Sequence, residues 1–170
     1  FGYGLSSTPV QLARAYAVLA SGGVLRPVTL KRQVGKVPGK QVLSGETAHQ
    51  INALLEQVVS ADGTAQRAAV PAYRVAGKTG TVHKVSPTGG YEADRYQSPF
   101  VGFAPVSAPR FVLAVMVDEP RGKYFGGEVA APVFARIMAD ALRMHGIRPD
   151  ADLDSGVTVV ASMSPGENGA

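Results

Sequence analysis

The chain has 170 residues, of which 45% are hydrophobic and 18% are charged, so it holds enough apolar material for one domain with a core, which excludes a disordered chain. It has no cysteine, which excludes disulfides, thiol nucleophiles and thiolate metal ligands, and its three histidines share no ligand spacing, so no metal site is predicted. The net charge of +4 favours anionic partners, but no basic cluster is interleaved with aromatic residues, so nucleic-acid binding is not predicted.

Three segments show the signals of amphipathic helices. Thr8 is a typical N-cap in front of a proline, and apolar residues at helical spacing predict a helix over residues 9–21, which two glycines end. Ser44 caps a second predicted helix over residues 45–62, with one apolar face. The last predicted helix covers about residues 131–145 and stops at the glycine that follows it.

Strands are predicted at residues 28–34, 73–85, 100–104 and 110–118, and the polar, glycine-rich residues 86–95 are predicted to form a long connection. The last of these strands is apolar almost throughout, so we expect both of its faces to be covered. Consecutive strands joined by short links pair in antiparallel fashion. The expected fold class is therefore α/β (α+β), with an antiparallel sheet flanked by helices.

The most informative stretch is a strand-like run that contains a lysine, two threonines and two glycines, Val75-Ala76-Gly77-Lys78-Thr79-Gly80-Thr81-Val82. One interpretation is a phosphate-binding loop, because residues 72–79 fit its loosest form. The bulky residues 73–75 make a poor cradle for phosphate, however, and residues 80–82 are a poor start for the helix that such a loop needs. The sequence therefore disfavours a nucleotide site here.

The other interpretation is a strand edge that binds substrate. Gly80 has no side chain, so a substrate backbone can lie against the strand. Lys78 and Thr79 supply a cation and a hydroxyl for a carboxylate or a proton network. The main-chain N–H near Thr81 can point at a developing oxyanion. This set of groups suits acyl transfer, although the tripeptide Lys-Thr-Gly alone is weak evidence because it also occurs in surface turns.

In its context, this motif resembles the transpeptidase domain of class B penicillin-binding proteins, especially the cell-division (septal) type. The matching stretches follow the order of that family, and they include Tyr3-Gly4-Leu5-Ser6-Ser7-Thr8-Pro9, Gly63-Thr64-Ala65, Val75-Ala76-Gly77-Lys78-Thr79-Gly80-Thr81, Phe100-Val101-Gly102-Phe103-Ala104-Pro105 and Tyr124-Phe125-Gly126-Gly127. The resemblance implies a penicillin-binding/β-lactamase-like serine transpeptidase fold, of which residues 1–146 are the C-terminal half only. Residues 147–170 are expected to be a loosely ordered tail.

The resemblance also implies a reaction, a serine-type D,D-transpeptidation without a cofactor. In that family a serine attacks the penultimate D-alanine of a peptidoglycan stem peptide, an amine of a neighbouring stem peptide resolves the acyl-enzyme, and β-lactams acylate the same serine. By position, Lys78 supports the proton network and the electrostatics, and Thr79 binds the substrate carboxylate. Gly80 lets the donor approach, while Thr81 gives its amide to the oxyanion hole and its hydroxyl to the carboxylate.

Further substrate-binding candidates lie beyond the motif. His83 is predicted on the same strand face as Thr81, where a substrate-facing role and a solvated histidine are both open. Tyr96, Tyr124 and Phe125 are expected to form an aromatic wall for the stem peptide or a β-lactam side chain, with ordinary loop packing as the alternative. Gly126, with the glycine that follows it, would let this loop shift when a ligand binds.

The family's nucleophile motif, Ser-x-x-Lys, and its second motif, Ser-x-Asn, do not occur in these 170 residues. We therefore expect an upstream fragment of the same protein to hold both motifs and to pack against residues 1–146, so this fragment alone should be inactive. Stem peptides, β-lactams and division-machinery proteins are the other expected partners. The resemblance implies a periplasmic domain of an inner-membrane-anchored bacterial protein. A non-catalytic β-lactam-recognition or interaction module is the alternative that the missing serine leaves open.

Overall fold

The computed structural model describes residues 5–35 and 37–151. Within them the elements are, in chain order, α1 (Pro9–Ala20), β1 (Val24–Leu25), β2 (Lys40–Gln41), α2 (Gly45–Gln57), the 3-10 helix η1 (Gln66–Ala68), β3 (Ala76–Thr79), β4 (Val82–Val85), β5 (Tyr91–Ala104), β6 (Phe111–Asp118), α3 (Gly126–Val129) and α4 (Ala131–Met144). This mixed architecture confirms the expected class, an antiparallel sheet flanked by helices. No helix in the described ranges is long and apolar enough to cross a membrane.

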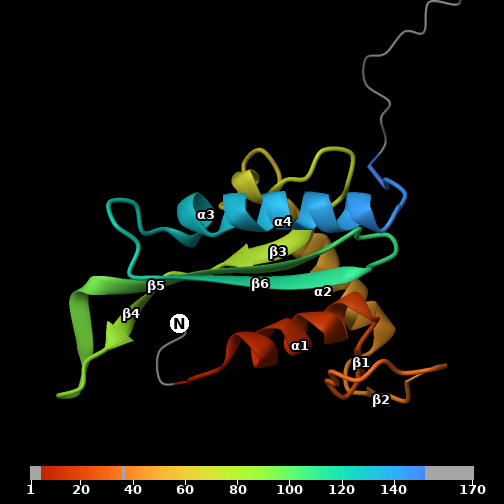
Figure 1. Ribbon diagram of the computed structural model, residues 1–170, viewed down its shortest axis with the longest axis horizontal. Coiled ribbons are helices and arrows are strands. Elements are labelled where there is room, and N and C mark those ends of the chain that lie inside the picture. Colours follow the sequence, from red (N-terminus) through yellow and green to blue (C-terminus); the bar gives the residue numbers. More distant parts are fainter. Residues whose placement is uncertain (1–4, 36, 152–170) are drawn as a thin grey trace, which may run out of the picture.

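The central strand of the larger sheet is β5. Along one of its edges β3 pairs with its second half and β4 with its first half, and along the other edge it pairs with β6. All three pairings are antiparallel. Figure 1 shows α3 and α4 on one face of the sheet and α1 on the other, with β1 and β2 beyond the end of α1. The edge of β3 that faces away from β5 pairs with no strand of the described residues.

The two predicted N-caps are confirmed. The Thr8 hydroxyl accepts a hydrogen bond from Gln11 N–H at 3.2 Å, and the Gln11 side chain accepts one from Thr8 N–H at 2.8 Å, which forms a capping box. Ser44 Oγ accepts from Thr47 N–H at 3.0 Å at the start of α2. Both helices therefore begin at the predicted residue because their first free N–H groups find a local acceptor.

The strand predicted over residues 73–85 is shorter and interrupted. It is divided into β3 and β4 at Gly80-Thr81, opposite Pro99 of β5. The Pro99 carbonyl accepts a hydrogen bond from Gly80 N–H at 2.8 Å, but proline has no N–H to donate in return. The ladder therefore breaks at the two residues that follow Lys78 and Thr79.

Two predictions for the connections are wrong. Residues 28–34 form no strand, since Leu30 and Val34 are almost fully exposed and no described strand pairs with the segment. Only the two-residue strands β1 and β2 pair in this region. The long connection predicted over residues 86–95 is instead a turn at residues 86–90, because β5 already begins at Tyr91 and pairs with β4.

Strand β6 is covered less than predicted. Helices α1 and α4 contact it from its two sides, but none of its residues is fully buried and Met116 is 38% exposed. Its edge away from β5 pairs with no described strand. Strand β6 is therefore an apolar edge strand of the described sheet, with one edge unpaired.

The main core lies between the sheet and α4. Phe100 of β5 and Phe134 of α4 are both fully buried, with ring centroids 4.7 Å apart in an edge-to-face arrangement. Met138 and Leu142, one and two turns further along α4, extend the same cluster. At the end of the helix, Tyr73 donates a hydrogen bond to the Ile147 carbonyl at 2.6 Å. The described start of the expected tail is therefore bonded to the domain, whereas residues 152–170 of that prediction lie outside the described residues.

Candidate functional site

Lys78 and Thr79 lie at the end of β3, on its open edge. The Lys78 side chain is exposed, and its ammonium group donates to the Thr79 carbonyl at 3.1 Å and to Thr79 Oγ1 at 3.2 Å. Thr79 Oγ1 also lies 3.4 Å from Thr64 Oγ1, which comes from the segment before η1. A cation is thus held beside a hydroxyl, the arrangement that a proton relay needs. No helix begins at Lys78, so the phosphate-loop interpretation is wrong.

Gly80 and Thr81 occupy the break between β3 and β4. The Thr81 hydroxyl donates to the Gly80 carbonyl at 2.8 Å and accepts from the Gly126 N–H at 3.2 Å. A Cβ on Gly80 would lie 2.8 Å from Pro99 Cγ, so this position has no room for a side chain. The hydrogen bonds of Thr81 therefore join the broken strand edge to the first residue of α3.

The glycines of α3 are required by close packing. A Cβ on Gly126 would lie 2.5 Å from the Gly80 carbonyl oxygen and still nearer to the Pro99 carbonyl oxygen. A Cβ on Gly127 would collide with the Thr64 carbonyl oxygen. Since all these obstacles are backbone atoms, they cannot rotate away. Close approach of α3 to the strand edge therefore requires glycine at both positions, and a shift of this loop on ligand binding stays a prediction.

A groove of about 460 Å³ opens beside this edge. It is bordered by the loop before η1, by the end of β3 and by the start of α3, through Gly63, Thr64, Gln66, Arg67, Thr79, Thr81, Phe125, Gly126, Gly127 and Glu128. The structure thus brings four predicted site residues to one groove: Thr79, Thr81, Phe125 and Gly126. Lys78 and Gly80 are sequence neighbours of Thr79 and Thr81 but do not line the groove.

His83 and the three predicted aromatic residues form a continuous row of ring contacts, from β4 through β5 to the loop before α3. The ring centroids of His83 and Tyr96 are 4.5 Å apart, those of Tyr96 and Tyr124 are stacked at 4.3 Å, and those of Tyr124 and Phe125 are 4.5 Å apart. Only Phe125, which is 55% exposed, reaches the groove itself. The other three rings do not line the groove, and Tyr124 contacts Phe125 directly. Ser98 Oγ fixes the loop further by donating a hydrogen bond to the Tyr124 carbonyl.

His83 also has a polar contact. Its Nδ1 lies 2.9 Å from the Glu92 carbonyl oxygen, and because a carbonyl can only accept, Nδ1 carries a proton in this contact. This bond fixes the ring plane against Tyr96. His83 therefore belongs to this row of ring contacts and does not line the groove beside Thr81.

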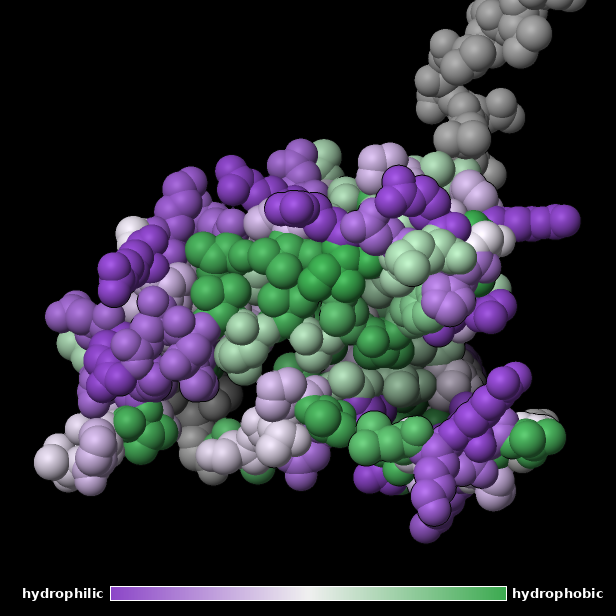
Figure 2. All heavy atoms as spheres, viewed as in Figure 1, coloured by the Kyte–Doolittle hydropathy of each residue, from purple (hydrophilic) through white to green (hydrophobic). Residues whose placement is uncertain are grey.

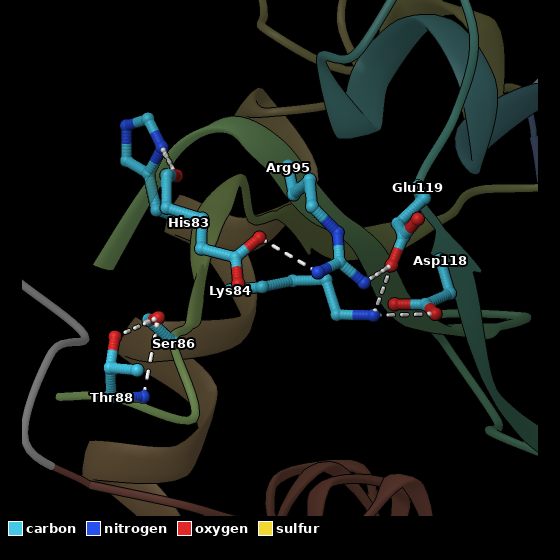
Figure 3. Close-up of polar contacts among 8 residues, drawn as sticks. His83, Lys84, Ser86, Thr88, Arg95, Asp118 and Glu119 are labelled. Atoms are coloured by element: carbon cyan, nitrogen blue, oxygen red, sulfur yellow. Dashed lines mark hydrogen bonds and ion pairs between the residues drawn. The ribbon is translucent and has the colours of Figure 1, made fainter. Parts of the chain in front are cut away.

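An ion-pair network holds β4 and β5 against the end of β6 (Figure 3). One carboxylate oxygen of Glu119 accepts from both Arg95 and Lys84, the latter at 2.5 Å, and Lys84 also bonds Asp118 at 3.0 Å. The hydrogen bonds from Arg95 and then Lys84 lower the pKa of Glu119 to about 2. The bonds from Lys84 and then Gln97 lower the pKa of Asp118, and the bonds to Glu119 and then Asp118 raise the pKa of Lys84. This network links side chains of β4 and β5, whose backbones pair, to the residues at the end of β6.

The sequence analysis assigned no site role to five residues that line the groove, namely Gly63, Thr64, Gln66, Arg67 and Glu128. Thr64 lies in one of the stretches that match the family, which was the only signal for it. Arg67 belongs to η1 and is exposed. Nothing in the local pattern connects it with β3, since the connection depends on the turn that brings residues 63–67 back to the strand edge. Within the described ranges, no three His, Cys, Asp or Glu residues gather as a metal site.

Comparison with known proteins places this arrangement in context. Residues 1–139 match the model of the penicillin binding protein transpeptidase domain. The chain is 44% identical over 152 residues to the peptidoglycan D,D-transpeptidase FtsI of Escherichia coli K12, covering 89% of the chain and 26% of that protein. It is 46% identical over 156 residues to the probable peptidoglycan D,D-transpeptidase PbpC of Pseudomonas aeruginosa, covering 91% of the chain and 27% of that protein. The chain thus spans about a quarter of the length of these curated relatives.

Two solved structures also match this chain closely in fold. The apo structure of the TP domain of penicillin-binding protein 3 from Burkholderia pseudomallei matches with a TM-score of 0.80 at 47% identity, over 89% of this chain and 46% of that one. A peptidoglycan glycosyltransferase structure from Burkholderia ambifaria matches with a TM-score of 0.78 at 42% identity, over 89% of this chain and 45% of that one. In both cases about half of the matched protein has no counterpart in this chain.

Proposed function

The chain belongs to the penicillin-binding protein transpeptidase family, and from this premise we propose that it is the C-terminal half of the transpeptidase domain of a peptidoglycan D,D-transpeptidase that acts in cell division. The observation that supports this most directly is the set Lys78-Thr79-Gly80-Thr81 at an open strand edge beside a groove. A donor stem peptide would add to this edge as an extended strand, with its terminal carboxylate at the hydroxyls of Thr79 and Thr81.

The proposed reaction is acyl transfer. A serine hydroxyl attacks the carbonyl carbon of the penultimate D-alanine, its proton passes to the relay that includes Lys78, and the terminal D-alanine leaves with its amine protonated. An amine of a neighbouring stem peptide then attacks the acyl-enzyme, which releases the serine and forms the cross-link. During both attacks the amide of Thr81 stabilises the oxyanion. A β-lactam would acylate the same serine, because its strained amide takes the place of the donor bond.

The serine itself would come from the other half of the domain, since Ser-x-x-Lys and Ser-x-Asn are absent from these 170 residues. A surface suited to that half is present. Figure 2 shows a broad hydrophobic area between α4 and α1. Helix α4 carries the exposed apolar residues Val133 and Ile137, and β6 carries Met116. Strand β6, whose edge away from β5 pairs with no described strand, lies between these two helices in Figure 1. We propose that the upstream fragment covers this surface and that the whole domain is periplasmic, anchored in the inner membrane by another part of the protein.

Fluorescent-penicillin labelling of the longer protein that contains these residues tests the proposal. Replacing Lys78 with alanine removes the cation from Thr79, and we expect labelling to slow by about 100-fold or more. Lys40→Ala is the matched control, since Lys40 is exposed in β2 and remote from the groove lining. Labelling of Lys78→Ala at the wild-type rate would contradict the role given to Lys78.

The absence of the serine motif also favours a second candidate, a non-catalytic module that recognises β-lactams or a protein partner. The two candidates differ in whether penicillin becomes covalently attached to the protein. An enzyme keeps the labelled penicillin after denaturation in detergent, whereas a recognition module releases it. Retention by the wild-type protein would therefore exclude the non-catalytic module.

A further inference from the structure

The groove beside β3 contains one cation without a partner. Arg67 lines the groove from η1 and is exposed, and no described residue makes a hydrogen bond or ion pair with its guanidinium group. The acidic residue in the lining, Glu128, already has a cationic partner, because its carboxylate forms an ion pair with the ammonium group of Lys123 at 2.9 Å. The lining therefore presents one uncompensated positive charge toward the groove.

Three hydroxyls share the groove with this cation. Thr64, Thr79 and Thr81 all line it, and the hydroxyl oxygens of Thr64 and Thr79 are 3.4 Å apart. The ammonium group of Lys78, by contrast, is bonded to Thr79 and lies outside the lining. A carboxylate that sits on these hydroxyls thus meets the cation of Arg67 within the groove, while Lys78 remains available to the proton relay.

We propose that Arg67 is the cation of the carboxylate subsite, which rests on the transpeptidase function proposed above. The ligand class is a carboxylate held next to the reacting carbonyl, as in the terminal D-alanine of a donor peptide or the ring carboxylate of a penicillin. The planar guanidinium fork suits a carboxylate, since it donates two parallel hydrogen bonds. Arg67 is then a specificity residue, and the cationic role for the substrate carboxylate belongs to it rather than to Lys78.

The test compares a charged and a neutral ligand on the longer protein. The second-order rate of acylation is measured with benzylpenicillin and with its methyl ester, for the wild type, Arg67→Gln and Arg67→Lys. We expect Arg67→Gln to lower the rate with benzylpenicillin by about 10- to 100-fold and with the ester by less than about 3-fold, because the charge-assisted contact with a carboxylate is lost only with the former. Arg67→Lys should restore part of the loss. Raised salt should slow the wild type more than Arg67→Gln.

Arg110→Gln is the matched control, because Arg110 is an exposed arginine beyond the far end of β5, outside the groove lining. Equal losses with both ligands, or no loss with either, would overturn the assignment of Arg67. A wild-type protein that neither ligand acylates would instead refute the proposed transpeptidase function. The two failures are therefore distinguishable in one experiment.

Discussion

Replacing Gly126 with alanine should disrupt the site with a single methyl group. The new Cβ would lie 2.5 Å from the Gly80 carbonyl oxygen, whereas carbon and oxygen atoms in contact are normally about 3.3 Å or more apart. The start of α3 and the strand edge must therefore separate by about 0.8 Å. This shift would lengthen the hydrogen bond from Gly126 N–H to Thr81 Oγ1, which is 3.2 Å long in the native arrangement.

A displacement of about 1 Å at a catalytic group costs on the order of 100-fold in rate, and overpacking costs about 1–3 kcal/mol in stability. We therefore expect Gly126→Ala in the longer protein to acylate with fluorescent penicillin about 100-fold more slowly, as measured by time-resolved labelling. Gly45→Ala is the control, because a Cβ there meets no atom closer than 4.0 Å. Wild-type labelling and an unchanged melting temperature in Gly126→Ala would refute the argument from close approach.

Two further predictions concern stability of the longer protein. Phe134→Ala should lower the free energy of unfolding by about 3–5 kcal/mol in a urea titration, because the ring is fully buried against Phe100, and a loss below about 1 kcal/mol would contradict that packing. For Glu119, the folded pKa of about 2 lies below the ordinary value of 4.5, so its carboxylate stabilises the fold above pH 4.5 and this contribution is lost as the pH falls toward 2. Glu119→Gln should flatten the pH dependence of unfolding in that window, and an unchanged slope would show that the network with Lys84 and Arg95 does not form.

Local signals predicted where α1 and α2 begin, but α2 ends at Gln57 and not at residue 62 as predicted. Thr8 and Ser44 define the starts of α1 and α2 because each side chain bonds an N–H only three residues away. The antiparallel pairing of the sheet likewise follows from the short links between its strands. The motif Lys78-Thr79-Gly80 was found for a similar reason, since its residues are contiguous in sequence.

Features that depend on distant partners were missed. The first half of β5 is polar, and it is a strand because it pairs with β4. Its Arg95 also binds Glu119, which follows β6, a contact that no short window of sequence contains. Residues 28–34 were predicted as a strand, but no strand of the described residues pairs with them. Arg67 enters the site only because residues 63–67 turn back toward β3. In each case the deciding interaction is tertiary rather than local.

The location of the covalent adduct tests the central claim most directly. The longer protein is incubated with benzylpenicillin and digested, and its peptides are identified by mass spectrometry. The account predicts one penicilloyl group per protein, on a serine outside the 170 residues described by this sequence, and loss of most of this adduct at short times in Lys78→Ala. An adduct on a serine within these residues, or no adduct at all, would contradict the claim that this strand edge serves a nucleophile from the other half of the domain.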